Sequence, residues 1–261
     1  MLPAERRGVI LKALNSGGAV RVADLAAELE VSEMTVRRDL DNLDAQELLL
    51  KVHGGAVARH NRGDEPHSSV KAGQQRAEKA AIAAAAADTV EDGMTIAIGA
   101  GTTTTELARR LHARSSITVV TNSISVFQEL TGPAAADGDA PVVYLSGGVR
   151  TPSDALVGPV ADTAIASFRV DATYLGVHGF DADAGLTSPN IAEAQTNRTL
   201  IGIGGRLVVL ADHTKYRQVG TCVFARLQQV QRLIVDDGLA AADRAVVESR
   251  VGHLVVASVD R

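Results

Sequence analysis

The amino-acid sequence predicts an α/β protein of two domains: a small helical domain that ends in a β-hairpin, then a larger domain with a mostly parallel sheet. Three observations lead to this fold class. Apolar residues recur at helical spacing through most of residues 1–58. A polar stretch interrupts that pattern at residues 59–74. Short apolar strands then alternate with amphipathic helices over residues 75–261, as in sheets that helices cover on both faces.

The small domain contains three predicted helices. The apolar residues that mark them fall within Arg6–Leu14, Val22–Leu29 and Val36–Leu43. Ser32 is a suitable N-cap for the third helix. Two predicted strands, Leu48–Val52 and Ala56–Ala58, flank the glycine pair Gly54-Gly55, which suits a tight hairpin. Helix, helix, helix, hairpin is the order of a winged helix-turn-helix module.

Residues 59–74 are predicted to be a linker, because polar residues, Gly and Pro replace the apolar pattern there. Seven strands and six helices are predicted beyond it. The strands are Thr95–Ile98, Ile117–Thr121, Val142–Leu145, Ala172–Val177, Leu207–Ala211, Leu233–Val235 and His253–Ala257. The helices are Ala77–Val90, Thr103–Leu111, Ile124–Leu130, Pro159–Phe168, Ile191–Ile203 and Ala240–Arg250.

Composition favours a soluble, cytoplasmic protein. With 261 residues, 46% of them hydrophobic, the chain can bury a sizeable core. No apolar stretch reaches the roughly 20 residues that a membrane span needs, so we expect no membrane contact. The first residues lack the apolar segment of a secretory signal, and the single cysteine, Cys222, excludes an internal disulfide. No histidine pair has metal-ligand spacing, so neither a metal nor a cofactor is expected.

The third helix carries the candidate DNA-reading residues. If Val36 and Leu40 face the core, Thr35, Arg38 and part of Arg37 lie outward near the helix N-terminus, the part of a recognition helix that enters the major groove. Arginine can bind guanine through two hydrogen bonds, while hydroxyls and first-turn amides hold phosphates. The predicted DNA contacts are Arg21, Ser32, Thr35, Arg37, Arg38, Lys51 and His53.

Charge alone does not favour DNA binding. The net charge is −5, and residues 1–59 hold eight Lys and Arg against nine Asp and Glu. An isolated Arg37-Arg38 pair is more often a solvated helix face. The stretch from Arg6 to Leu40, however, resembles the DeoR family of bacterial regulators, and Val52–Ala56 resembles that family's wing. The shared residues are Arg6, Ile10, Leu14, Ser32, Thr35, Val36, Arg37, Arg38, Asp39 and Leu40. This resemblance implies a regulator that binds operator DNA.

A candidate phosphate cradle follows the predicted strand Thr95–Ile98. The run Gly99–Thr105 combines glycines, which let the backbone approach a ligand, with hydroxyl donors and a helix N-terminus that presents N–H groups to an anion. A plain turn before a Thr-capped helix is the alternative. Dinucleotide binding is disfavoured, because Thr104 replaces the third glycine of the fingerprint and Thr121-Asn122-Ser123 supplies no acid for a ribose.

The resemblance to the DeoR family extends through the larger domain. The matching runs are Gly101–Thr104, Val119–Ser123, Leu145–Gly148, Val157–Pro159, Gly185–Asn190 and Leu210–Lys215. It implies a sensor fold related to ribose-5-phosphate isomerase, and an effector that is usually a sugar phosphate. The implied effector-binding residues are Gly99, Ala100, Gly101, Thr102, Thr103, Thr104, Asn122, Gly147, Gly148, His178, Glu193 and Lys215.

The chain also departs from the family pattern. Gly99 stands where the family commonly has Asp, and Val177-His178-Gly179 where it often has Ala-Asp-Gly. Asn197-Arg198 replaces the usual Lys-Arg after Glu193. Two carboxylates and an ammonium are thereby missing from the expected pocket, which predicts an effector different from the commoner ones.

A regulator is therefore favoured over two alternatives. An isomerase of sugar phosphates would need a base, for which Glu193, Asp181, Asp183 or Lys215 are available, but it has no use for a winged helix. A winged helix used for protein contacts is the other alternative. We expect a repressor of a carbohydrate-metabolism operon and no enzyme. Self-association as a dimer or larger is expected, because a single winged helix buries little surface on DNA.

Overall fold

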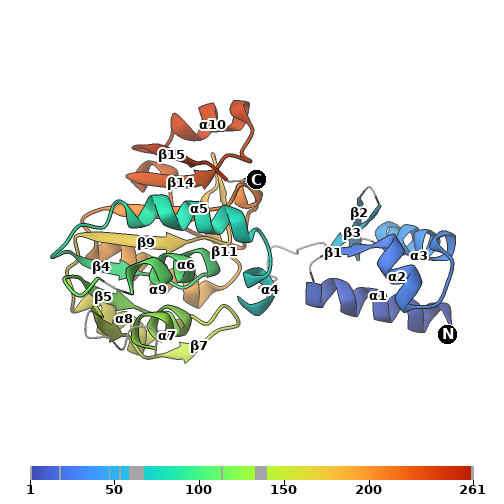
Figure 1. Cartoon of the computed structure of the whole chain (residues 1–261), viewed down its shortest axis with the longest axis horizontal. Helices are drawn as coiled ribbons and strands as arrows, with labels where there is room; N and C mark the ends of the chain where they lie inside the picture. The colour runs from blue at the N-terminus through green and yellow to red at the C-terminus, as the bar shows by residue number, and fades with distance from the viewer. Residues whose placement is uncertain are drawn as a thin grey trace. The chain divides into compact units, whose positions relative to one another are not determined.

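The computed structural model describes residues 2–17, 19–46, 48–52, 54–58, 68–112, 114–132 and 140–259. The chain divides into two compact units, Met1–Pro66 and His67–Arg261 (Figure 1). The smaller unit is mainly helical, and the larger one is built on a parallel sheet with helices on both faces. The predicted α/β fold class is confirmed.

The smaller unit combines three helices with a small antiparallel sheet in the order β1-β3-β2. Its elements are α1 (Pro3–Gly17), β1 (Ala19–Arg21), α2 (Val22–Glu28), α3 (Glu33–Ala45), β2 (Leu49–Val52) and β3 (Gly55–Ala58). Strand β1 has only three residues and was not predicted. It pairs with β3, and so joins the hairpin to the start of α2.

The core of the smaller unit is formed by the apolar faces that the periodicity predicts. Ile10, Val36 and Leu40 are fully buried. The other buried members are Leu14, Val22, Leu25, Leu29, Leu43, Leu49 and Ala56. A buried ion pair lies among them: Arg6 Nε donates to Asp39 Oδ2 over 2.5 Å, and both side chains are about one-tenth exposed. The two charged residues of the helical motif therefore hold α1 against α3.

Seven parallel strands form the main sheet of the larger unit, in the order β15-β14-β12-β9-β4-β5-β6. They are β4 (Thr95–Ile98), β5 (Thr118–Thr121), β6 (Val142–Leu145), β9 (Ala172–Gly176), β12 (Leu207–Ala211), β14 (Arg232–Asp236) and β15 (Leu254–Ala257). The helices are α5 (Arg76–Ala87), α6 (Thr102–Leu111), α7 (Ile124–Thr131), α8 (Pro159–Ala166), α9 (Ile191–Ile203) and α10 (Ala241–Glu248).

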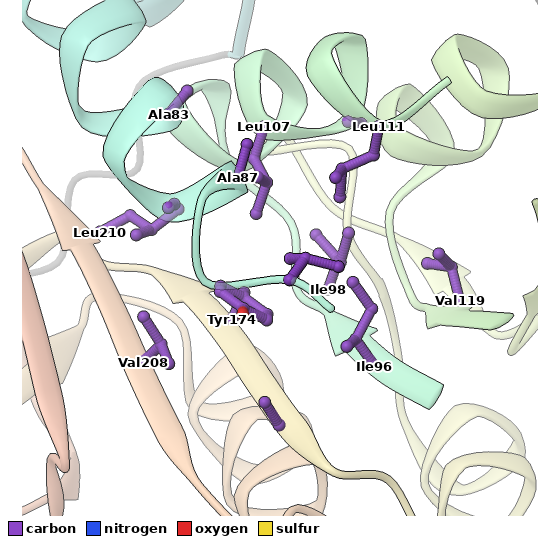
Figure 2. Close-up of a cluster of buried hydrophobic side chains, with 14 of the residues drawn as sticks. Ala83, Ala87, Ile96, Ile98, Leu107, Leu111, Val119, Tyr174, Val208 and Leu210 are labelled. Carbon is purple, nitrogen blue, oxygen red and sulfur yellow. The ribbon is translucent and has the colours of Figure 1, made fainter. Parts of the chain in front are cut away.

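Each face of the sheet has its own apolar core. Helices α5, α6 and α7 cover one face, where Ile82, Leu107 and Ile98 are fully buried (Figure 2). Helices α8, α9 and α10 contribute to the core on the other face, with Ile165 and Leu200 fully buried. Continuous apolar strands with buried residues on both faces are the pattern from which the parallel sheet was predicted.

The strand order reverses between β4 and β9. The chain proceeds from β4 to β5 and β6 in one direction, and from β9 to β12, β14 and β15 in the other. The loops after β4 and β9 therefore diverge at the carboxyl edge of the sheet. In open α/β sheets, ligands bind in the crevice at such a switch point.

Several short elements complete the larger unit. A second sheet has the order β10-β11-β13, and a two-stranded ribbon joins β7 to β8. Their bounds are β7 (Val149–Arg150), β8 (Leu156–Val157), β10 (Gly179–Asp181), β11 (Gly185–Ser188) and β13 (Cys222–Ala225). Within the predicted linker 59–74, residues 59–67 lie outside the described part of the chain, while Ser68–Ala72 form helix α4.

Candidate functional site

Helix α3 presents a polar N-terminal face to solvent. Ser32 is its N-cap: the Ser32 hydroxyl oxygen accepts from the Thr35 amide over 3.2 Å and lies 2.9 Å from the Thr35 hydroxyl. Val36 and Leu40 are buried, whereas Arg37 and Arg38 are exposed. The helix therefore has the orientation that the sequence predicts, with both arginines outward.

The exposed charges of this unit differ in their partners. Arg37 donates to Glu33 on the preceding turn over 2.7 Å, and Lys51 on β2 pairs with Asp41. The Arg38 guanidinium forms no hydrogen bond or ion pair with the described residues. Exposed pairs contribute little to stability. A DNA phosphate could replace Glu33 as the partner of Arg37, or Asp41 as the partner of Lys51, at a small cost in free energy. Arg38 can bind DNA without giving up a partner among the described residues.

Arg21 is exposed at the N-cap position of α2, and His53 lies outside the described residues. Sequence reasoning overlooked Met34, which is 69% exposed in the first turn of α3. An apolar residue at an outward position of the helix was the available signal. Met34 offers an apolar contact beside the hydroxyls of Ser32 and Thr35, and thymine methyl groups in the major groove are bound by such contacts.

In the larger unit, the loop after β4 leads directly into the N-terminus of α6. Gly101 is the N-cap of that helix, and its carbonyl oxygen accepts from the hydroxyls of Thr104 (2.9 Å) and Thr105 (2.8 Å). The amides of the first helical turn have no intrahelical acceptor. Thr104 is fully buried, so its hydroxyl closes the turn. Thr102 is partly exposed and lies at the mouth of the loop.

Glycine is required at two positions of this loop. Gly101 has φ +149°, a conformation that favours glycine, and a Cβ there would come within 3.3 Å of Thr104 Oγ1. A Cβ at Gly99 would come within 2.5 Å of Leu175 Cδ2. Gly99 thus lies where even a small side chain would displace the core residue Leu175. Ala100 separates the two glycines and is partly exposed.

Asn122 follows β5, beside the loop after β4. Its side chain is 1% exposed, and Nδ2 donates to the Leu156 carbonyl over 3.1 Å. Its Oδ1 has no hydrogen-bond partner among the described residues. An unsatisfied buried acceptor is costly, so this oxygen fits a site that a ligand's hydroxyl would complete.

Gly147 and Gly148 follow β6 and both have positive φ, +71° and +121°. A Cβ at Gly148 would come within 2.7 Å of the Val157 carbonyl oxygen, so a side chain there would prevent the β7–β8 ribbon from closing. For a methyl group added at Gly147, the nearest atom would be Val160 Cγ1, at 3.7 Å. Gly148 therefore allows the backbone to approach Val157 closely, whereas the space beside Gly147 would admit a methyl group.

Glu193, in the first turn of α9, is tied to the loop between β7 and β8. Its carboxylate accepts from the Thr151 hydroxyl over 2.5 Å and from the Ser153 hydroxyl. The same loop contains Asp154, whose carboxylate accepts from Ser68 on α4 over 2.6 Å. Helix α4 is thereby connected to Glu193 through one short loop.

Lys79 on α5 is the clearest residue that sequence reasoning missed. It is 4% exposed, and its ammonium donates to the carbonyls of Lys71 and Gln74. Burial lowers the pKa of Lys79, the charge of Asp212 opposes this shift, and Lys215 adds to it. The signal was present, since Lys79 precedes Ile82 and Ala83 by three and four residues and so lies on the buried face of the helix.

The remaining predicted residues lie on the strand ends beside the loop. Lys215 belongs to the 3₁₀ helix His213–Lys215 after β12, and it is partly exposed. His178 lies between β9 and β10 and is half-buried. The structure thus brings the predicted effector residues of β4, β5, β9 and β12 to one edge of the sheet. Glu193 is instead held by the hydroxyls of Thr151 and Ser153 in the loop between β7 and β8.

No group of three or more His, Cys, Asp or Glu side chains in the described ranges could hold a metal ion. No helix there is long and apolar enough to cross a membrane.

Comparisons with known proteins match both units. The DeoR-like helix-turn-helix domain matches residues 6–62, and the DeoR C-terminal sensor domain matches residues 74–237. Among solved structures, a ribose-5-phosphate isomerase A from Methanocaldococcus jannaschii aligns over 54% of each chain, with 17% identity and a TM-score of 0.38.

Two curated relatives span nearly the same length as this chain. The HTH-type transcriptional regulator GlpR of Haloferax volcanii is 34% identical over 100% of each chain. The transcriptional repressor AccR of Agrobacterium fabrum is 31% identical over 97% of each. With both domain families matched in order and relatives matched from end to end, this chain belongs to the DeoR family of transcriptional regulators.

Proposed function

We propose that this chain is a DNA-binding repressor of a carbohydrate-metabolism operon, and that a sugar phosphate or a similar phosphorylated metabolite controls its affinity for the operator. The observation that carries the proposal is the exposed N-terminal face of α3, with Arg38 and the hydroxyls of Ser32 and Thr35. A relative named as the glycerol-3-phosphate regulon repressor of Escherichia coli supports the assignment to carbohydrate control.

On the operator, α3 would lie in the major groove. Arg38 is assigned a base contact, because its guanidinium is not engaged by the described residues and can bind guanine through two hydrogen bonds. Ser32 and Thr35 would bind a phosphate at the helix N-terminus, where the dipole also favours an anion. Arg21, Arg37, Lys51 and His53 would add backbone contacts.

The effector would bind at the carboxyl edge of the sheet. Its phosphate would accept hydrogen bonds from the first-turn amides of α6, near Gly101 and Thr102. A sugar hydroxyl would donate to Asn122 Oδ1, the acceptor that the protein leaves without a partner among the described residues. Lys215 would add a positive charge at the partly exposed end of β12.

Isomerase activity is not proposed, because the acids near this edge are already engaged. Glu193 accepts from two hydroxyls, and Asp212 accepts from the Thr214 amide and hydroxyl. Backbone hydrogen bonds, the first from Ala184, lower the pKa of Asp181, which makes it a weak base. A general base requires a carboxylate that can reach and accept the substrate's proton.

Helix α4 is assigned the role of passing the effector signal to the linker. The Ser68 amide donates to the Pro152 carbonyl over 3.0 Å, and its hydroxyl donates to Asp154. The Lys71 carbonyl accepts from Lys79. Movement of the Thr151–Asp154 loop on effector binding would therefore move Ser68–Ala72, in the C-terminal part of the linker. We place the DNA-binding domain at 1–58, the linker at 59–74 and the sensor domain at 75–261.

The regulator would act in the cytoplasm as a dimer or larger assembly, since two DNA-binding domains are needed to read two half-sites. Selection of duplexes from a random pool by the full chain tests the DNA-binding half directly. A family of enriched sequences with a repeated half-site is expected. Assay of the same preparation for pentose-phosphate isomerisation tests the enzymatic alternative, and turnover there would contradict the proposal.

A further inference from the structure

A pocket lies at the edge of the main sheet opposite the α6 loop, where strands β9, β12 and β14 begin. The residues that line it are Thr89, Ala172, Tyr174, Arg206, Val208, Gln231 and Arg232, and its volume of about 70 Å³ is that of a small anion. Ala172, Tyr174 and Val208 are buried and form its floor, and Figure 2 shows Tyr174 beside Val208. None of these residues belongs to the proposed effector site.

Two arginines flank this floor on the same face of the sheet. Arg232 on β14 is in register with Val208 on β12, and Arg206 precedes Val208 by two residues. The side chains of Arg206, Val208 and Arg232 all line the pocket. Two like charges thus lie at the rim of one pocket.

The charges of these arginines are not compensated within the described ranges. Neither guanidinium forms a hydrogen bond or an ion pair there. The charges of Glu91, Arg206 and Arg232 all influence the pKa of the Tyr174 phenol, so the Glu91 carboxylate lies in the same region. It forms no ion pair with Arg206 or Arg232 in the described part of the chain. Like charges at neighbouring sheet positions are destabilising, so an anion between them would relieve the repulsion.

The polar groups on the floor suit such an anion. The Thr89 hydroxyl donates to the Ala86 carbonyl over 2.7 Å, so Tyr174 donates to Thr89 in their 2.8 Å contact. The phenol oxygen can still accept a hydrogen bond. Burial raises the pKa of Tyr174, so the phenol stays neutral at neutral pH and does not repel an anion. Gln231 accepts from the Leu207 amide through Oε1, which leaves its N–H groups as donors.

We propose that this pocket is a second small-molecule site, which binds a phosphate or carboxylate group between Arg206 and Arg232. Guanidinium groups bind such planar or tetrahedral oxyanions through paired hydrogen bonds. The phenol oxygen of Tyr174 would accept from a hydroxyl of the same ligand. The ligand class is a small hydroxylated anion, and the site lies apart from the α6 loop because the two occupy opposite edges of the sheet.

Inorganic phosphate is the probe, and the full chain carrying Gly101→Asp is the parent, so that the proposed effector site is blocked. Isothermal titration should give one phosphate site in this parent. Adding Arg206→Gln and Arg232→Gln should weaken that site by about tenfold or more, because two charge-assisted contacts are lost. A control that adds Arg76→Gln and Arg226→Gln removes two exposed charges elsewhere and should leave the affinity unchanged.

The perturbed Nε–H signals of Arg206 and Arg232 in NMR spectra should identify the occupied residues. Equal affinity in the two charge-matched variants would mean an adventitious ion only, and would overturn the proposal. Absence of phosphate binding in the Gly101→Asp parent would also overturn it. If the wild-type chain binds one phosphate and Gly101→Asp abolishes that binding, the α6 loop binds phosphate and the pocket between Arg206 and Arg232 does not.

Discussion

The Ser68 hydroxyl donates to the Asp154 carboxylate over 2.6 Å, across 86 positions of sequence. Burial alone would raise the pKa of Asp154, but hydrogen bonds from Ser68 and Arg150 and the charge of Arg150 outweigh it and lower the pKa. The carboxylate is therefore ionised at neutral pH when it holds α4. This contact connects Ser68, the first described residue after positions 59–67, to the loop that binds Glu193.

Replacing Asp154 by Asn should loosen α4, because the charged acceptor is lost. Amides of residues 68–72 should exchange with solvent about tenfold faster, measured by hydrogen-exchange mass spectrometry. Phosphate affinity should be retained, and the change of operator affinity on adding effector should shrink. Asp183→Asn, at a side chain 91% exposed, is the control. Unchanged exchange in α4 would remove Asp154 from the signal path.

The pair Arg6–Asp39 should account for much of the stability of the smaller unit. Asp39→Ala leaves a buried guanidinium without its partner, so the free energy of unfolding should fall by about 3–5 kcal/mol. Urea titration, followed at probes within each unit, should show the loss in the smaller unit alone. Arg6→Ala should cost a similar amount, and the double variant less than the sum of both. Additive losses would mean that the two side chains do not interact.

Arg38 and Arg37 should differ on the operator. Arg38→Ala should weaken binding by about 1–3 kcal/mol and relax the base preference at one position of each half-site. Arg37→Ala should instead reduce the slope of log affinity against log salt by about one unit, as expected for a phosphate contact. Fluorescence anisotropy at several salt concentrations measures both. If neither variant changes the affinity and both remain folded, α3 is not the recognition helix.

The full chain should have at least twice the monomer mass in solution, because one DNA-binding domain of this size covers only one half-site. Light scattering at micromolar concentration, with and without a duplex carrying two half-sites, measures it. Two chains should bind each duplex. Tight binding of one chain to one half-site would contradict the expected assembly.

Much of the fold could be predicted because the strands and helices are long and regular. Strands 95–98, 142–145 and 207–211 were predicted at the bounds observed, since each is a short run made up almost wholly of apolar residues. Strands β1 and β10 have three residues each, too few to show a period of two. Helix α4 has five residues in a polar stretch, and the hydrogen bonds of its first residue, Ser68, are made to residues more than 80 positions away.

The site could be predicted only in part. Spacing identifies the outward face of α3 and the glycines of the α6 loop, since both are local features. The partner of Arg6 and the orphan oxygen of Asn122 depend on residues that are distant in sequence. The buried role of Thr104 was missed for the same reason, because a hydroxyl in a Gly-Thr run can face either the turn or the ligand.

One titration shows whether a phosphorylated ligand controls the binding of this regulator to its operator. The affinity of the full chain for its selected operator is measured with sugar phosphates and with the same sugars lacking phosphate. The same measurements are made on Gly101→Asp and on the control Gly202→Asp. A Cβ at position 202 would meet no atom within 4 Å. We predict that at least one sugar phosphate changes the affinity by about tenfold in the wild type and in Gly202→Asp, and leaves Gly101→Asp unchanged. An equal response to the unphosphorylated sugar, or a full response in Gly101→Asp, would contradict the account.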